Sequence, residues 1–267
     1  RDWSSDVCSS DLDRMTDQSV PRNTLLHDRI ALVTGGARNI GRAIALSLAE
    51  AGAAVIVNAR ASQNEAEETV ALIEAAGGRA IACLTDITDR SAVAGMMTVA
   101  EKTFGRIDIL VNNAVSHGTK AFMDLTAEDW RHTLEVSLDG AFNCIQACLP
   151  QMIERGGGSI VNIGGSFGHK GSPGRAATAA AKAGLSGLTR ALAVEFAAHN
   201  INVNDVAPGP VNTLRKTPAR IKADAIPMGR FAEPAEVAEM VKLLCSPAGR
   251  YITGQTIHVN GGFVMNN

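Results

Sequence analysis

The chain has 267 residues, a length that suits one large α/β domain or two small ones. Apolar residues make up 46% and charged residues 19% of the sequence, which argues for a sizeable core and against a disordered chain. The formal net charge is −2, without blocks of like charge, which argues against nucleic acid or an anionic membrane as a partner. No apolar run is long enough to span a bilayer, and we expect a cytoplasmic protein.

The first residues of the chain look foreign to the rest. Residues 1–12 show neither a helical nor a strand period and lack the apolar core of a signal peptide. They resemble a translated sequencing adapter, and Met15 is the expected start of the natural chain. We therefore treat residues 1–14 as a non-native leader and residues 15–267 as a single domain.

Ile30–Val33 is a short apolar run that predicts a buried strand. It leads into the glycine-rich segment Thr34–Gly41 and then into a predicted helix that ends near residue 51. Backbone N–H groups at the amino end of a helix attract negative charge, and glycines let a pyrophosphate approach closely. A glycine-rich turn can also be only a turn, but this one opens a repeated strand–helix pattern, which favours a nucleotide site.

Apolar strand-like segments alternate with amphipathic ones along the rest of the chain. The predicted strands are Ile30–Val33, Ala54–Asn58, Arg79–Cys83, Ile107–Val111, Ser159–Ile163, Ile201–Val206 and Thr256–Val259, and helices are predicted near residues 39–51, 62–76, 89–104, 127–154, 174–198 and 234–246. This pattern predicts an α/β fold, a single Rossmann-type doubly wound domain with a seven-stranded parallel sheet and helices on both faces. Ligands are then expected at the carboxyl ends of the strands, with the irregular segment Asn212–Pro227 as a mobile cover.

Five cysteines, Cys8, Cys83, Cys144, Cys148 and Cys245, form an odd set without the paired spacing of a metal site. Cys144 and Cys148 share one face of a predicted helix, but no cluster of histidines or carboxylates joins them. We therefore interpret the cysteines as reduced core thiols and predict no metal site.

Several motifs occur in the order found in a known family: Thr34–Gly41, Asp86-Ile87, Asn112–Ala114, Pro208–Thr213 and Ile252–Gln255. From about Asp28 onward the sequence resembles the short-chain dehydrogenase/reductase family, and is similar to the branch that includes 3-oxoacyl-carrier-protein reductases. The resemblance implies a Rossmann-type domain that binds NAD or NADP, acts on a small molecule and forms a homo-oligomer, a tetramer or a dimer. Asn39 stands where the family usually has a second glycine, and Asn tolerates left-handed dihedrals.

The end of the second predicted strand selects the cofactor in this family. An Asp or Glu there would bind the ribose hydroxyls and repel a 2′-phosphate, but this chain has Asn58, Ala59 and Arg60. Arg38 can reach the same place, so NADP is favoured over NAD; the alternative is that Arg60 is a solvated surface residue. By resemblance, the cofactor-binding residues are Gly35, Arg38, Asn39, Ile40, Gly41, Asn58, Arg60, Asp86, Ile87, Asn113, Ala114, Lys182, Pro208, Gly209, Val211 and Thr213.

Family members usually reduce a carbonyl with a tyrosine, a lysine four residues later, a serine and an asparagine. In this chain the lysine is kept as Lys182, whereas Thr178 stands in the tyrosine place, Gly165 in the serine place and Ser137 in the asparagine place. The spacing puts Thr178 and Lys182 on one helix face, but an aliphatic alcohol is a far weaker acid than a phenol. The catalytic set is therefore degenerate.

Other residues are candidates for the missing proton donor. Ser166 comes one residue late, and on an extended strand end this slip would turn its side chain to the other face unless the loop bulges. His117 and His169 could titrate near neutral pH, although a lone loop histidine is more often a surface residue. His117 is preferred because it follows the fourth strand; Tyr251 lies where the family has no catalytic group. The candidate catalytic residues are Lys182, Thr178, Ser166, Ser137 and His117.

Three functions remain open at this point. The first is an NADP(H)-dependent oxidoreductase with an altered proton path that reduces a carbonyl, imine or activated alkene. The second is non-redox chemistry on the same fold, of the lyase, isomerase, cyclase or dehalogenase type, and the third is a non-catalytic nucleotide-binding subunit. The retained glycine-rich turn argues against a protein that has lost its nucleotide. The alanine- and leucine-rich helices near 127–154 and 174–198 are candidates for a subunit interface, unless they pack only on their own sheet.

Overall fold

The computed structural model describes residues 25–214 and 221–265. The expected leader, Cys8 and part of the expected cover segment lie outside these residues. The strands are β1 (Ile30–Val33), β2 (Ala54–Ala59), β3 (Arg79–Leu84), β4 (Ile109–Asn112), β5 (Gly158–Ile163), β6 (Ile201–Pro208) and β7 (Thr256–Val259). The α-helices are α2 (Asn39–Glu50), α3 (Gln63–Ala75), α4 (Arg90–Thr103), α5 (Ala127–Leu134), α6 (Gly140–Arg155), α7 (Phe167–Lys170), α8 (Ala176–Phe196) and α9 (Pro234–Cys245).

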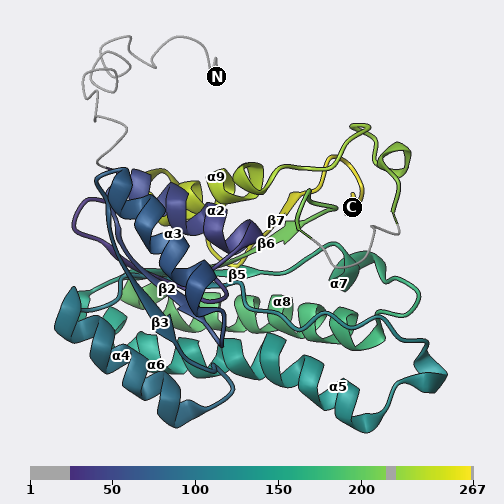
Figure 1. Cartoon of the computed structure of the whole chain (residues 1–267), viewed down its shortest axis with the longest axis horizontal. Coiled ribbons are helices and arrows are strands. Elements are labelled where there is room, and N and C mark those ends of the chain that lie inside the picture. Colours follow the sequence, from purple (N-terminus) through teal and green to yellow (C-terminus); the bar gives the residue numbers. More distant parts are fainter. Residues whose placement is uncertain (1–24, 215–220, 266–267) are drawn as a thin grey trace, which may run out of the picture.

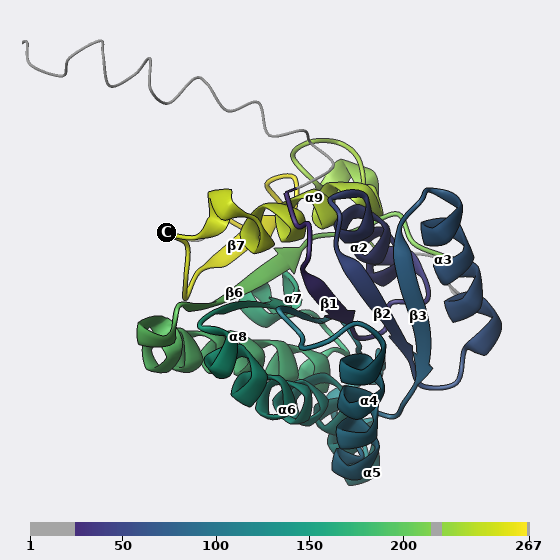
Figure 2. The same cartoon turned by 90° about the vertical axis from the view of Figure 1, so that its left-hand side faces the viewer.

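The strands form one sheet in the order β3-β2-β1-β4-β5-β6-β7, and every neighbouring pair is parallel. Helices α2, α3 and α9 cover one face, and α4, α6 and α8 cover the other (Figures 1 and 2). The predicted seven-stranded doubly wound sheet is therefore confirmed for the described residues. The predicted helix near 127–154 is in fact two helices, α5 and α6, joined by a π-helical segment over Glu135–Asp139.

The central strands are apolar throughout because both faces of the sheet are covered. All four residues of β1 are buried, and they alternate between two hydrophobic clusters. Ala31 and Val33 contribute to the cluster that contains Leu48 of α2, whereas Leu32 contributes to the one that contains Met96 of α4. This burial on both sides is what makes the sequence of a parallel strand a continuous apolar run.

The cysteines that the structure describes are free thiols, and all but the half-buried Cys83 are buried. On α6, burial raises the pKa of Cys144 to about 12, and the Cys148 thiol lies 3.6 Å from the sulfur of Met97. These side chains act as core packing groups. Among the described residues, the helices lack the length and apolar character needed to cross a membrane.

The order in which successive strands are added to the sheet changes direction beside β1, which lies between β2 and β4. From β1 the chain proceeds outward to β2 and β3, returns to β4, and then proceeds to β7 on the other side. In open parallel sheets the crevice at the carboxyl ends of the strands on either side of such a reversal is the usual ligand site. The candidate site residues of this chain follow the strands at that edge.

Candidate functional site

The glycine-rich turn after β1 is built around two close backbone approaches. A Cβ on Gly35 would lie 3.1 Å from the Cα of Ala114, and one on Gly41 would lie 2.1 Å from the carbonyl oxygen of Gly35. Asn113, which follows β4, donates its side-chain amide to the carbonyl oxygens of Thr34 at 3.1 Å and Gly35 at 3.0 Å. The ends of β1 and β4 are therefore joined directly beneath the turn.

Asn39 adopts the left-handed conformation that its sequence position predicts, with φ of 52°. It is the first residue of α2, and the preceding Arg38 is extended and provides no side-chain cap. The first backbone N–H groups of α2 are thus not capped by that side chain, as an anion site at a helix amino end requires. The geometry fits a pyrophosphate at the turn.

The end of β2 differs from the sequence-based expectation in two respects. Asn58 is buried and donates its amide to the carbonyl oxygens of Thr85 at 3.0 Å and Cys83 at 3.3 Å, so its side chain joins β2 to the β3 side of the sheet. Glu65 of α3 lies 3.5 Å from Arg38 Nη1, a carboxylate that the sequence pattern did not place here. Arg60 is exposed at this strand end.

The loop after β3 is held in place by contacts within the loop and with α6. Asp86 accepts hydrogen bonds from the backbone N–H and hydroxyl of Thr88 at 3.0 and 2.8 Å. Ile87 is buried, and its carbonyl oxygen accepts a hydrogen bond of 3.0 Å from the amide of Asn143 on α6. A Cβ on Gly140 would lie 2.6 Å from Ile87, so α6 packs closely against this loop. Asp86 and Ile87 therefore form a rigid edge of the crevice.

The loop after β6 forms the opposite edge. The carbonyl oxygen of Pro208 accepts a hydrogen bond of 3.0 Å from the N–H of Ser166, which connects β6 with the segment after β5. A Cβ on Gly209 would lie 2.8 Å from Asn260, and Val211 pairs with Ala232 in an isolated parallel bridge. Thr213 follows on the same loop. The predicted cofactor residues thus lie at or just after the carboxyl ends of β1, β2, β3, β4 and β6, apart from Lys182 on α8.

Thr178 and Lys182 share the buried face of α8, as their spacing predicts, and are 3% and 5% exposed. Lys182 Nζ donates a hydrogen bond of 2.5 Å to the carbonyl oxygen of Ile163, the last residue of β5. Burial lowers the pKa of Lys182 to about 8, while the charge of Asp205 raises it. The pKa of this buried amine therefore lies close to neutral pH, so that a small change in its surroundings changes its charge.

The segment after β5 is not the extended strand end that was expected around Ser166. The strand ends at Ile163, and Ser166 has helical dihedrals, φ −55° and ψ −25°, immediately before α7. Strand alternation therefore does not decide where its side chain points, and that expectation was wrong. Gly165 has φ of 154° and no atom within 4 Å of a built Cβ, so the serine place is spatially open but conformationally suited to glycine.

Ser137 lies in the π-helical segment between α5 and α6 and is 2% exposed. Its hydroxyl accepts a hydrogen bond of 3.3 Å from the N–H of Ser116, on the loop after β4. π-Helical turns often occur at functional sites, and this one anchors the loop that carries the exposed His117. Ser137 thus positions a loop, and His117 is on the exposed part of that loop.

Sequence reasoning missed Asp205, a carboxylate inside β6 that is 0% exposed. Ser186, one turn after Lys182 on α8, donates its hydroxyl to Asp205 Oδ2 at 2.5 Å. A signal was present, since a carboxylate is rare in a strand that is buried almost throughout, as Ile201–Pro208 is. Asp205 therefore interacts with the same face of α8 that carries the retained Lys182.

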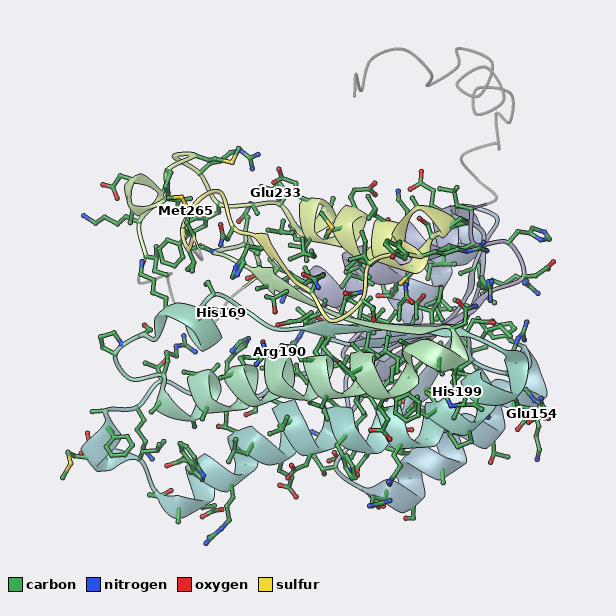
Figure 3. All side chains as sticks on the ribbon, turned by 180° about the vertical axis from the view of Figure 1, so that it is seen from behind. Glu154, His169, Arg190, His199, Glu233 and Met265 are labelled. Atoms are coloured by element: carbon green, nitrogen blue, oxygen red, sulfur yellow. The ribbon has the colours of Figure 1, made fainter. Side chains whose placement is uncertain are left out.

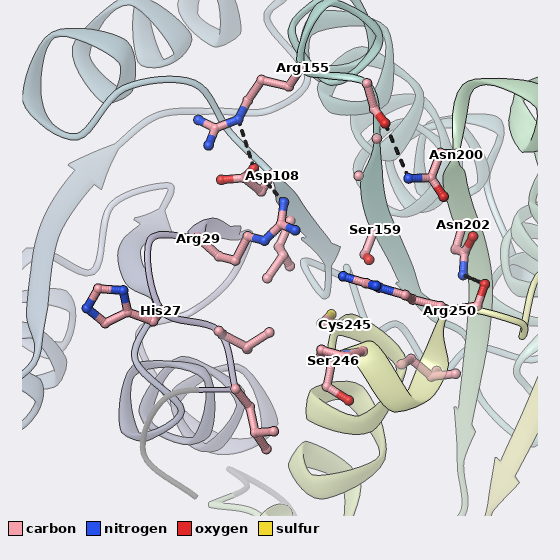
Figure 4. Close-up of a pocket in the computed structure, with 18 residues that line it drawn as sticks. His27, Arg29, Asp108, Arg155, Ser159, Asn200, Asn202, Cys245, Ser246 and Arg250 are labelled. Carbon is pink, nitrogen blue, oxygen red and sulfur yellow. Dashed lines mark hydrogen bonds and ion pairs between the residues drawn. The ribbon is translucent and has the colours of Figure 1, made fainter. Parts of the chain in front are cut away.

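A cavity of about 290 Å³ opens at the opposite, amino edge of the sheet (Figure 4). There Asp108, 1% exposed, accepts contacts of 3.1 Å from both Arg29 and Arg155 and a hydrogen bond of 2.9 Å from the N–H of Ile30. Arg250 also lines this cavity. Because β1, β4 and β5 begin at this edge and end at the other, the cavity is separate from the candidate site.

Comparisons with known proteins agree with this architecture. Residues 35–264 match the family described as enoyl-(acyl carrier protein) reductase. A 3-oxoacyl-[acyl-carrier-protein] reductase FabG of Staphylococcus aureus is 40% identical over 240 residues, covering 88% of this chain and 98% of that protein. A 3-oxoacyl-[acyl-carrier-protein] reductase of Synechocystis is 40% identical over 245 residues, covering 91% and 99%. A solved short-chain dehydrogenase/reductase variant of Serratia marcescens is 33% identical, with a TM-score of 0.85 over 90% of this chain and 99% of that chain.

Proposed function

The chain belongs to the short-chain dehydrogenase/reductase family, and from this premise we propose that it is an NADP(H)-dependent oxidoreductase with an atypical active site. Its substrate is a small molecule with a carbonyl, imine or activated alkene, and it works without the family's tyrosine. The observation that carries the proposal is the combination of an intact phosphate turn, with Asn39 in the left-handed conformation, and a buried Lys182 on α8.

The turn suits a dinucleotide because Gly35 and Gly41 permit close packing of the turn that a Cβ would block, and the Arg38 side chain does not cap the start of α2. Arg38 and Arg60 supply two guanidiniums for a 2′-phosphate, which favours NADP over NAD. The cofactor, when bound, supplies the hydride, and the protein supplies geometry and charge. Asp86, Ile87 and the loop after β6 would enclose the remainder of the dinucleotide.

The polar groups on α8 act on the substrate side. With a pKa of about 8, Lys182 is mostly a cation at neutral pH and stabilises negative charge that develops on a substrate oxygen. Thr178 provides a hydroxyl that donates a hydrogen bond to that oxygen, although it is too weak an acid to lose its proton. An imine or activated alkene depends less on a strong acid than a ketone does, so those substrates rank first.

The test has two stages. NADPH and NADH are titrated by fluorescence, and then loss of the reduced-nicotinamide absorbance is followed with a panel of ketones, imines and enones. Turnover of any member of the panel supports the proposal. Binding without turnover across the panel would instead indicate a non-catalytic nucleotide-binding subunit, the candidate that the replacement of the tyrosine, serine and asparagine favours. A failure of both nucleotides to bind contradicts the proposal outright and leaves non-redox chemistry.

We also propose that the protein is a homo-oligomer that pairs through α6 and α8. Apolar side chains are exposed on both helices: Phe142 is 41% exposed, Ile153 38% and Val194 84%. Such exposure on helices rich in small residues suits a subunit contact. Size-exclusion chromatography with light scattering tests this directly, and a monomer at micromolar concentration would contradict it.

A further inference from the structure

We propose that Asp205 is a positioning residue of this active site: its buried carboxylate is the counter-ion that keeps Lys182 charged, and His169 and His258 modulate it. The inference rests on the proposed function in that it treats Lys182 as an active-site group. It goes beyond that function by including β6, α7 and β7 in the control of the lysine.

Asp205 has fewer hydrogen-bond donors than a buried carboxylate needs. Oδ2 accepts the hydroxyl of Ser186 at 2.5 Å and that of Thr256 at 3.4 Å. Oδ1 is buried and has no hydrogen-bond partner among the described residues. Burying a charge without full pairing costs several kcal/mol, so its retention in the strand calls for a compensating charge.

The end of β5 leaves room for this carboxylate. A Cβ on Gly164 would lie 2.3 Å from Asp205 Oδ1, a distance that no real side chain tolerates. The carboxylate of Asp205 can therefore lie where it does only because residue 164 is a glycine. The neighbouring Gly165 occupies the place of the family's serine, so the segment that lacks the serine is also the one that admits the carboxylate.

The compensating charge is that of Lys182, which lies one turn before Ser186 on the same buried face of α8. Burial is the main cause that lowers the pKa of Lys182, and the charge of Asp205 opposes it. Conversely, burial raises the pKa of Asp205, while Ser186, Lys182, His169 and, least of these, the backbone N–H of Gly164 lower it. Each charge thus makes the other less costly, as in a coupled pair.

Two histidines interact electrostatically with Asp205 and complete the group. His169 is on α7, which packs on α8 (Figure 3), and its ring centroid lies 4.8 Å from that of His258 in an edge-on contact. His169 Nε2 is buried without a hydrogen-bond partner among the described residues. Burial and the charge of His169 lower the pKa of His258, and Asp205 raises it. Positive charge on this pair of histidines therefore adds to the electrostatic environment that Asp205 and Lys182 share.

The consequence for the reaction concerns the supply of protons. A proton that leaves the Lys182 ammonium for a reduced substrate oxygen breaks an N–H bond, forms an O–H bond and leaves a neutral amine. The negative charge of Asp205 then favours uptake of the next proton from water by that amine. In a site where Thr178 replaces the phenol, this resetting of Lys182 is the step that Asp205 accelerates.

The test uses Asp205→Asn, which keeps the shape and removes the charge. In apo protein, the ring protons of His258 are titrated by NMR, and the midpoint is expected to fall to lower pH by roughly half a unit or more, because the charge of Asp205 raises the pKa of His258. In the holoenzyme, the limb of the pH–rate profile that reports Lys182 is expected to move to lower pH by about one unit. Ser186→Ala should move both readouts in the same direction by less. Unchanged titrations in both variants would overturn the proposal.

A matched control is Thr189→Val, another buried position on the same helix face, whose hydroxyl contacts Asn162 rather than Asp205. It should cost stability without moving either titration. The placement is checked independently of activity by Gly164→Ala, which should destabilise the wild type much more than the Asp205→Ala background. Equal losses in the two backgrounds would contradict the placement. Shifted histidine titrations in a protein that does not bind NADPH would retain the Asp205 coupling and reject the proposed function.

Discussion

The side-chain amide of Asn39 and the backbone of Leu214 are joined by a pair of hydrogen bonds. Asn39 Oδ1 accepts the N–H of Leu214 at 2.9 Å, and Asn39 Nδ2 donates to its carbonyl oxygen at 3.4 Å. The substitution of asparagine for glycine in the turn thus connects the start of α2 with the loop that follows β6. A glycine at this position would keep the left-handed backbone but not the connection.

We expect Asn39→Gly to keep the turn and release Leu214, whereas Asn39→Ala also loses about 1–2 kcal/mol because alanine resists the left-handed region. Hydrogen exchange of the Leu214 amide should accelerate in both variants, and urea unfolding should separate them. Asn200→Ala is the matched control, because Asn200 also has a positive φ of 58° but lines the cavity at the amino edge of the sheet (Figure 4), away from Leu214. It should lose stability and leave Leu214 protected; equal protection in all three variants would contradict the connection.

The contact between Arg38 and Glu65 makes a prediction about cofactor choice. Arg60→Glu should weaken NADPH binding roughly tenfold or more and NADH binding much less, because hydrogen bonds to a charged phosphate are worth about 1.5–3 kcal/mol. Glu65→Gln should strengthen NADPH binding, since it frees Arg38. Glu67→Gln, on the same helix, is the control and should change neither affinity. Equal losses for both nucleotides in the Arg60 variant would rule out a 2′-phosphate at this position.

The buried Lys182 makes stability depend on pH in a defined window. Its pKa is about 8 in the folded protein, against an ordinary value of 10.5 for a lysine side chain in water. Between these two values the folded state binds fewer protons than the unfolded state. The free energy of unfolding is therefore highest above pH 10.5, where Lys182 is neutral in both states, and it decreases as the pH falls towards 8. Relative to Lys182→Met, the wild type should lose roughly 3 kcal/mol across that window. Urea unfolding at several pH values measures this.

An exposed lysine provides the control for that measurement. Lys102→Met, on the exposed side of α4, should leave the pH dependence of stability unchanged. Asp205 acts in the opposite sense at lower pH, because its pKa is higher in the folded than in the unfolded protein. Its contribution to the free energy of unfolding is present below the ordinary aspartate pKa of 3.8 and is lost as the pH rises through the pKa of the folded state. Parallel curves for the wild type and Lys182→Met between about pH 8 and 10.5 would refute the assignment.

Restoring the missing acid tests whether the rest of the scaffold is intact. Thr178→Tyr combined with Gly165→Ser should raise ketone reduction by about 10²-fold or more, the usual contribution of a positioned acid. The tyrosine should carry most of this gain, because Gly165 has φ of 154° and a serine there must move the backbone. The gain should vanish when Lys182→Met is added. Intact NADPH binding with no gain would mean that the site differs in more than its acid.

The sequence was sufficient for the regular parts of the molecule. Apolar runs such as Ile30–Val33 locate the strands because both sheet faces are covered, and the φ of Asn39 follows from the side chains that tolerate it. Contacts between distant segments were not predictable from local pattern. Glu65 lies beside Arg38, and Asp205 behind Lys182, only because α3 and β6 pack where they do.

The error over Ser166 has the same origin. Its side-chain direction was inferred from strand alternation, but the chain leaves the strand after Ile163 and turns into α7. The end of the strand at Ile163 was predicted, but the helical turn that places Ser166 just before α7 was not. Loop geometry at the carboxyl ends of strands, where the candidate site lies, is decided by the packing of neighbouring elements.

The order β3-β2-β1-β4 has a consequence for how the protein is made. During synthesis β1 pairs early with β2 on one side, but its other edge waits for β4, which ends at Asn112. About 80 residues must be added in the meantime, roughly 4–16 s at ribosomal speed. For that interval the most apolar strand of the nascent chain exposes unpaired N–H and C=O groups, and it is then that a chaperone would most effectively prevent strand-to-strand association.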